Sequence, residues 1–379
     1  TRGNEDASHE ARSRPDWFYT DAISDQAADY VRRHAADHPD TPFFMYVAYT
    51  AAHWPMHAPA EEIAKFKGKY DGGYEPQRAA RLAKMKELGL VPKEIELSPQ
   101  AEDWSKVEHK AWEARCMEVY AAMISRMDTG IGRIVEQLKE SGQLDNTLIL
   151  FLQDNGGCAE GIGRRDGEMN KQWRGKTGPS NMPGPADTFI AYGRGWANVS
   201  NTPFREYKHW THEGGVSTPL VAHWPKGISK ELNGKLERQP GHLIDLMATC
   251  VDLGGVTYPK EHAGQPIKPL RGVSLQPAFA GKEIGRKEPI FWEHEGNRAV
   301  REGKWKLVAK EHKPWELYDI DVDRAEMNNL AAKEPERVKK MAAQWDAYAA
   351  KSDVLPLGAW NHKKDAPANQ KKAAKGKAK

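Results

Sequence analysis

The stretch TLILFLQDNGG (residues 147–157) joins an apolar run to a polar, glycine-rich end. The apolar residues from Leu148 to Leu152 predict a strand that is buried on both faces, which is typical of a parallel sheet. Ligands of open α/β sheets bind at the carboxyl ends of such strands. Asp154 and Asn155 offer hard oxygen ligands at this end, and the glycines after them let the backbone approach an ion or an anion closely. Asp-Asn-Gly-Gly is also ordinary turn chemistry, so both interpretations stay open.

Length and composition indicate a globular protein. The chain has 379 residues, 39% of them hydrophobic, with 13 Trp and 12 Tyr, which is enough for one large α/β domain and a smaller unit. Residues 361–379 carry seven Lys and one Asp, or +6, so the net charge of +3 leaves −3 for residues 1–360. Residues 1–360 therefore give no sign of nucleic-acid binding. No apolar run in the chain is long enough for a membrane span. The three scattered cysteines form neither a disulfide framework nor a CxxC metal site.

Helical and apolar segments alternate along the first half of the chain. Helical spacing begins at Asp21 and ends at Pro39, and residues 118–140 carry a long apolar stripe at the same spacing. Between them, PFFMYVAYT (residues 42–50) predicts a second continuous apolar strand. The alternation indicates a doubly wound sheet.

The second half begins with a long loop and ends with a different pattern. Residues 156–204 have no clear helical period and are rich in Gly, Pro and Asn, which indicates a functional or disordered loop. A short apolar strand is expected within residues 204–225, and a helix in HLIDLMATCVDLGG (residues 242–255). The later segments IFWEH, GKWKLVA and WELYDI predict a small antiparallel sheet, followed by a helix over residues 335–349.

These patterns predict three parts of the chain. Residues 1–288 are expected to form the α/β domain, and residues 289–355 the antiparallel-sheet subdomain with its packing helix. Residues 356–379 are expected to be a disordered, Lys-rich tail.

Side chains with catalytic chemistry follow the apolar segments. His53 and His57 come after the second predicted strand, and Pro55 between them argues against the helical geometry that a zinc site at this spacing needs. A buried, hydrogen-bonded loop histidine is the alternative for His53. Lys208, in a His-rich segment ahead of a glycine pair, is suited to meet an anionic substrate oxygen, although most lysines are simply surface residues.

Four motifs in series resemble the sulfatase family, close to the bacterial arylsulfatase-type enzymes. They are PFFMYVAYTAAHWPMHAP, TLILFLQDNGG, YKHWTHEGGVSTPLVAHWP and HLIDLMATCVDLGG. The resemblance extends from about Asp21 to Leu355 and leaves the tail after Trp360 outside. It implies an alkaline phosphatase-like fold, that is, an α/β sandwich with a mostly parallel central sheet plus a small C-terminal α+β domain with an antiparallel sheet.

The resemblance implies hydrolysis of a sulfate ester by a calcium-assisted formylglycine mechanism. In the family a cysteine is converted to formylglycine, whose hydrated aldehyde attacks sulfur while one calcium ion polarises the sulfate oxygens. By motif, Asp154 and Asn155 match calcium ligands, His53 matches the histidine that helps protonate the leaving oxygen, and Lys208 matches the lysine that contacts the sulfate. A sulfated small molecule or sulfated carbohydrate is the implied substrate, and a periplasmic or secreted location is the implied compartment.

The sequence departs from the family pattern at its beginning. The formylglycine signature is Cys or Ser, any residue, Pro, a small residue and Arg, and neither Cys116, Cys158 and Cys250 nor any serine fits it. The family's first strand, which ends in an Asp-Asp pair, is also not among these residues. We therefore expect that the chain starts partway through the enzyme and that formylglycine lies in a missing N-terminal portion. We also expect these residues alone to have no turnover, low stability and weak calcium binding.

Two other functions fit the sequence. One is a phosphoester or phosphonate hydrolase of the same superfamily, and the other is a non-catalytic protein that keeps the fold and an anion pocket. An in-frame Cys-x-Pro-x-Arg motif upstream of Thr1 would favour the sulfatase, whereas a start codon near Thr1 would favour the binding protein. A nucleic-acid role for the Lys-rich tail is weaker, because the tail has no interleaved aromatic residues.

Overall fold

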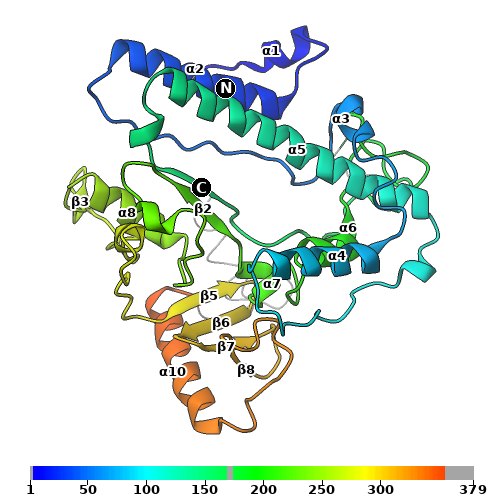
Figure 1. The fold of residues 1–379 in the computed structure, drawn as a ribbon. Coiled ribbons are helices and arrows are strands. Elements are labelled where there is room, and N and C mark those ends of the chain that lie inside the picture. The colour runs from blue at the N-terminus through cyan, green and yellow to red at the C-terminus, as the bar shows by residue number, and fades with distance from the viewer. Residues whose placement is uncertain (1–2, 169–173, 355–379) are drawn as a thin grey trace, which may run out of the picture.

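Two long helices, α2 (Tyr19–Asp37) and α5 (Lys110–Glu140), lie side by side along one edge of the molecule (Figure 1). The computed structural model describes residues 3–168 and 174–354. The two helices cross so closely that a Cβ atom at Gly130 would lie 2.1 Å from the hydroxyl oxygen of Ser24. Both predicted helices are confirmed, and α5 begins eight residues earlier than the apolar stripe suggested.

The segment 42–50 crosses beneath these helices in an extended conformation. Its odd-numbered side chains from Phe43 to Val47 pack on the two helices, whereas Phe44 and Tyr46 are 80% and 82% exposed. This alternation has the period of a strand, but within the described residues the segment has no strand beside it to pair with. The predicted second strand is therefore an extended segment rather than a member of a sheet.

The strand expected in residues 148–152 is present as β1 (Ile149–Leu152), and it pairs with β2 (Leu220–His223). The pairing is antiparallel, with Ile149 opposite His223 and Leu152 opposite Leu220. In the described part of the chain, β1 therefore belongs to a two-stranded antiparallel sheet and not to the expected parallel sheet. With a single neighbour, β1 is half-buried rather than buried on both faces, and Val221 of its partner is 57% exposed.

Shorter elements complete this part of the fold. They are α1 (Ser8–Ser13), α3 (Ala60–Ala64), α4 (Tyr74–Glu87), η1 (Trp104–Lys106), η2 (Leu144–Asn146), α6 (Gly193–Ser200), α7 (Glu213–Val216), η3 (Lys230–Leu232), α8 (Ile244–Leu253), β3 (Glu261–His262), β4 (Gln265–Pro266) and α9 (Gln276–Phe279). Helix α8 confirms the helix predicted in residues 242–255. Helix α6 lies in the segment predicted to be a loop. It is only eight residues long and contains two glycines, so its helix propensity is low and a sequence pattern gives little sign of it.

The main hydrophobic core lies where α4, α5 and α6 meet. Trp196 of α6 is fully buried, with its ring against those of Tyr74 and Trp104, and its indole N–H donates to the carbonyl oxygen of Glu113 at 2.8 Å. No helix in the described part of the chain combines the length and the apolar character that a membrane crossing requires.

The C-terminal sheet has four antiparallel strands in the order β5 (Ile290–His294), β6 (Asn297–Glu302), β7 (Trp305–Ala309) and β8 (Glu316–Asp319). Helix α10 (Pro335–Lys351) packs on it and buries Trp345 (Figure 1). The predicted antiparallel sheet and packing helix are confirmed. Strand β6 was missed because its sequence, NRAVRE, is mostly polar. The boundary after residue 288 stays a prediction, and the predicted tail (356–379) lies outside the described residues.

A buried cluster of charges joins this sheet to α7. Lys306 of β7 is fully buried, and its ammonium nitrogen lies 2.8 Å from a carboxylate oxygen of Glu213 and 3.0 Å from one of Glu326. Burial alone raises the pKa of Glu213, but the positive charges of Lys306 and Arg324 outweigh it and lower this pKa to about 2. Helix α7 is thereby fixed between the β1–β2 pair and the C-terminal sheet (Figure 1).

Replacing Lys306 with Met should destabilise the protein strongly. The substitution removes the ammonium group that pairs with buried Glu326 and leaves Glu213 with Arg324 at 3.4 Å, which costs about 3–5 kcal/mol in the free energy of unfolding. Lys304→Met is the matched control, because Lys304 pairs with Asp319 while half-exposed and its loss should cost no more than about 1 kcal/mol. Urea unfolding measures both values, and equal losses in the two variants would contradict the assigned role of the cluster.

The same cluster predicts a dependence of stability on pH. The pKa of Glu213 is about 2 in the folded protein and 4.5 ordinarily, so its ionised form stabilises the fold fully above pH 4.5. This contribution is lost as the pH falls from about 4.5 toward 2. The unfolding free energy should therefore fall more from about pH 6 to about pH 3 in the native protein than in Lys306→Met. A larger fall in the variant would show that another group dominates.

Candidate active site

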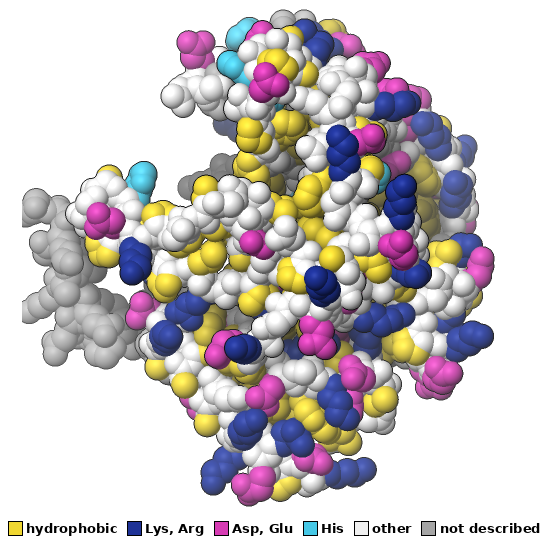
Figure 2. Space-filling view, turned by 60° about the vertical axis from the view of Figure 1, so that its left-hand side comes forward, with side chains coloured by type: hydrophobic (Ala, Val, Ile, Leu, Met, Phe, Trp, Pro, Cys, Tyr) yellow, Lys and Arg dark blue, Asp and Glu magenta, His cyan; other side chains and the backbone are white. Residues whose placement is uncertain are grey.

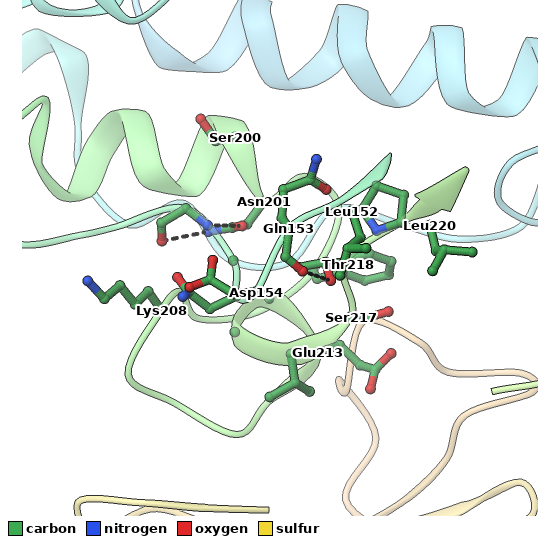
Figure 3. A pocket seen from close by; sticks show the side chains of 18 of the residues that line it. Leu152, Gln153, Asp154, Ser200, Asn201, Lys208, Glu213, Ser217, Thr218 and Leu220 are labelled. Atoms are coloured by element: carbon green, nitrogen blue, oxygen red, sulfur yellow. Dashed lines mark hydrogen bonds between the residues drawn. The ribbon is translucent and has the colours of Figure 1, made fainter. Parts of the chain in front are cut away.

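The loop after β1 borders a cavity of about 2780 Å³. Asp154, Asn155, Lys208 and His53 all line it, and Figure 3 shows Asp154 and Lys208 among the residues of the pocket wall. In Figure 2 the molecule is deeply hollowed on one side, with hydrophobic side chains along the walls. The structure therefore brings the four predicted site residues to one cavity.

Two segments hold the loop through hydrogen bonds to its backbone. The N–H of Gly156 donates to the carbonyl oxygen of Gly215 at 2.9 Å, and the N–H of Gly157 donates to the side-chain oxygen of Asn201 at 2.9 Å. A Cβ atom at Gly156 would lie 1.8 Å from the carbonyl oxygen of Gly214, so this position requires glycine. The close approach predicted for the glycine pair is thus an approach to the protein's own backbone.

Asp154 and Asn155 present oxygen atoms to the cavity. Asp154 is exposed and Asn155 is half-buried. Within residues 3–168 and 174–354, neither side chain has a hydrogen-bond or ion-pair partner, while the backbone around them is held firmly. A free carboxylate beside a free amide suits a hard cation such as calcium, which takes about 6–8 oxygen ligands in all.

Lys208 and His53 meet although they are 155 residues apart in the sequence. The ammonium nitrogen of Lys208 lies 3.0 Å from Nε2 of His53, and Nδ1 of His53 lies 2.7 Å from the carbonyl oxygen of Trp54. Because a carbonyl oxygen only accepts, Nδ1 carries the proton and Nε2 accepts from the ammonium group. His57 takes no part in this pair, since its Nε2 lies 2.7 Å from the carbonyl oxygen of Thr188.

The Lys208 segment is bound directly to the loop after β1. The backbone N–H of Lys208 donates to the carbonyl oxygen of Gly157 at 3.0 Å. The residues that follow Lys208 serve other contacts: His212 is buried beside Glu316, and Glu213 belongs to the buried charge cluster. The predicted His-rich group is therefore divided, and Lys208 is the member that lies against His53.

Glu160 lies beside the site, in contact with Trp54 and Cys158 of the cavity wall, and the sequence analysis missed it. One of its carboxylate oxygens accepts hydrogen bonds from the indole of Trp54 at 2.6 Å and from the thiol of Cys158 at 3.1 Å. Burial tends to raise the pKa of Glu160, but these bonds and the positive charge of Lys208 lower it. The carboxylate partly balances the charge of Lys208. No motif marks it, because its role follows from contacts with Trp54, which is 106 residues distant.

Two family models match the chain. The model described as Sulfatase matches residues 2–256, and the model described as N-sulphoglucosamine sulphohydrolase, C-terminal, matches residues 206–347. An arylsulfatase of Klebsiella aerogenes is 34% identical over 286 residues, which cover 73% of this chain and 60% of that protein. An uncharacterized sulfatase of Schizosaccharomyces pombe is 33% identical over 329 residues, with 83% and 58% covered. The chain thus spans about 60% of the length of these relatives.

Solved structures share the fold. The structure of Ps i-CgsB superposes with a TM-score of 0.58 at 24% identity, covering 88% of this chain and 55% of that one. A phosphonate monoester hydrolase of Agrobacterium radiobacter superposes with a TM-score of 0.52 at 20% identity, covering 88% and 62%. These likenesses support the predicted alkaline phosphatase-like α/β fold. With a family model matched over residues 2–256 of 379, the protein belongs to the sulfatase family.

Proposed function

We propose that the protein acts in the hydrolysis of a sulfate ester, with His53 and Lys208 as catalytic residues. The observation that carries the proposal is the Lys208–His53 pair, 3.0 Å apart, beside the unpartnered oxygens of Asp154 and Asn155 on one cavity. A cation and an imidazole next to a hard-ion site form a set suited to an anionic ester. The matched arylsulfatase supports an aryl sulfate as the first substrate to test.

The two catalytic side chains have separate tasks. The ammonium group of Lys208 attracts the sulfate oxygens and stabilises negative charge on the leaving oxygen. Nε2 of His53, which accepts from Lys208 in this structure, becomes available for a proton when Lys208 turns to the substrate. The carbonyl oxygen of Trp54 keeps Nδ1 protonated and the ring oriented.

Asp154 and Asn155 would hold a calcium ion. When bound, the ion supplies Lewis-acid chemistry that polarises the sulfate oxygens. The protein's own contribution is rigidity, because the hydrogen bonds of Gly156 and Gly157 fix the loop that presents both oxygens. The formylglycine signature fits none of the cysteines or serines in residues 1–379, so the nucleophile stays a prediction, as does a periplasmic or secreted location.

Lys208→Ala and His53→Ala should each abolish most sulfate release. We expect kcat/KM to fall by about 10²-fold or more for Lys208→Ala, which removes charge stabilisation, and by about 10²–10⁴-fold for His53→Ala, which removes proton transfer. Lys226→Ala, at an exposed lysine away from the cavity, is the control. The measurement is release of a coloured phenol from an aryl sulfate by the product of the complete open reading frame, sequenced upstream of Thr1.

The same assay separates the alternative functions. Normal turnover by both variants would refute the assigned roles of Lys208 and His53. Faster cleavage of a phosphonate monoester than of the aryl sulfate would indicate the phosphonate hydrolase, which the fold likeness makes worth testing. Binding of the aryl sulfate without turnover, together with a start codon near Thr1, would indicate the anion-binding protein.

Asp154→Ala should weaken calcium binding by at least about tenfold, because it removes the one carboxylate of the proposed pair. Asp154 has no partner in the described residues, so the free energy of unfolding should change by less than about 0.5 kcal/mol. Calorimetric titration with calcium measures the affinity. Asp145→Ala, at an exposed aspartate outside the cavity, is the control, and equal calcium affinity in the two variants would refute the site.

A further inference from the structure

Three side chains that can ligate a metal ion meet at the edge of the cavity. His209 directly follows Lys208, His294 ends β5, and Glu295 begins the turn into β6. One ligand atom from each lies within 4.8 Å of the other two, and this is the one such group found among the described residues. Nδ1 of His209 lies 2.9 Å from a carboxylate oxygen of Glu295. The rings of His209 and His294 meet edge to face with centroids 5.2 Å apart.

The backbone around this group is arranged to bring the three side chains together. Asn297 is only 3% exposed, and its amide nitrogen donates to the carbonyl oxygens of His209 at 3.2 Å and His294 at 3.0 Å. His209 and Glu295 both adopt left-handed backbone conformations, with φ of 94° and 50°, which L-residues rarely adopt. A buried amide thus joins the backbones of the two histidine-bearing segments.

We propose that His209, His294 and Glu295 bind a divalent transition-metal ion of the zinc type. Two imidazoles and one carboxylate are a donor set that zinc prefers and that calcium, which selects oxygen ligands, does not. Zinc ligand bonds of about 2.0–2.2 Å place tetrahedral ligand atoms about 3.3–3.6 Å apart. The present separations reach that value through small side-chain rotations, which are open to these three residues because all are at least partly exposed.

The proposed ion would connect the Lys208 segment to the β5–β6 turn. His209 and His294 both line the cavity, so a fourth coordination position is accessible to water or to an anionic group of a ligand. Because His209 is adjacent to Lys208 in the chain, the ion would also restrict the backbone that carries this lysine. The site does not depend on the proposed sulfate chemistry, and its donor atoms are separate from those of Asp154 and Asn155.

The test is a zinc titration of the native protein, freed of metal by chelation and then kept in excess calcium. Calorimetry should give one zinc ion per chain, and Co²⁺ in its place should give the intense visible absorption of a tetrahedral site. X-ray absorption of the zinc-loaded native protein should show two imidazole ligands. His294→Ala and Glu295→Gln should each weaken zinc binding by more than about tenfold. Glu295→Gln is an isosteric change at an exposed residue, so it serves if His294→Ala does not fold.

Two controls separate this site from others. His312→Ala, at an exposed histidine beside Glu311 in the same subdomain, should bind zinc like the native protein. Asp154→Ala should also keep the native zinc affinity. The proposal is overturned if the native protein binds no zinc, if X-ray absorption shows no imidazole ligands, or if folded His294→Ala and Glu295→Gln bind zinc as tightly as the native protein.

Discussion

The buried ion cluster of Lys306, Glu213 and Glu326 is the constraint on which the site depends. Fully buried charges are costly unless each is paired. Here the ammonium group of Lys306 contacts both carboxylates, and Arg324 lies 3.4 Å from Glu213. The backbone N–H of Glu213 donates to Glu326 at 2.8 Å. Glu213 is the first residue of α7, and Gly214 and Gly215 follow it. The pairing therefore determines where these two glycines can lie, and through them the C-terminal sheet influences the site.

From α7 the constraint passes to the site through backbone contacts. The carbonyl oxygen of Gly215 accepts from the N–H of Gly156, and the hydroxyl of Thr218 donates to the carbonyl oxygen of Gln153 at 2.9 Å. Lys208 is bound to the same loop through its own N–H. Most of these bonds use main-chain groups, so the side chains of Asp154 and Asn155 are left free for a ligand. Rigid backbone with unpartnered side chains is the arrangement that a preorganised ion site requires.

The sequence was sufficient to predict helices and strands with a strong local pattern. Its predictions failed where the formation of an element depends on a neighbouring segment. The continuous apolar run before Gln153 and the stripe of α5 were sufficient for a strand and a helix. Strand β6 was missed because most of its residues are polar, and helix α6 was missed because it is short and contains two glycines. Residues 42–50 have the composition of a strand, yet strand formation also needs a neighbour, and no local pattern states whether one is present.

For the site, the sequence predicted which residues take part but not how the fold places them relative to one another. Motifs selected His53, Lys208, Asp154 and Asn155, but no spacing rule relates His53 to Lys208 across 155 residues. The direct Lys208–His53 contact also sets a chemical condition. While the ammonium group donates to Nε2, the imidazole cannot carry a proton there, so the pair is not yet arranged for proton transfer. A substrate oxygen that draws Lys208 away frees the lone pair of Nε2, which must then take up a proton from solvent before it can donate one to the leaving oxygen. Binding of the anion is thus coupled to the protonation of His53 at Nε2.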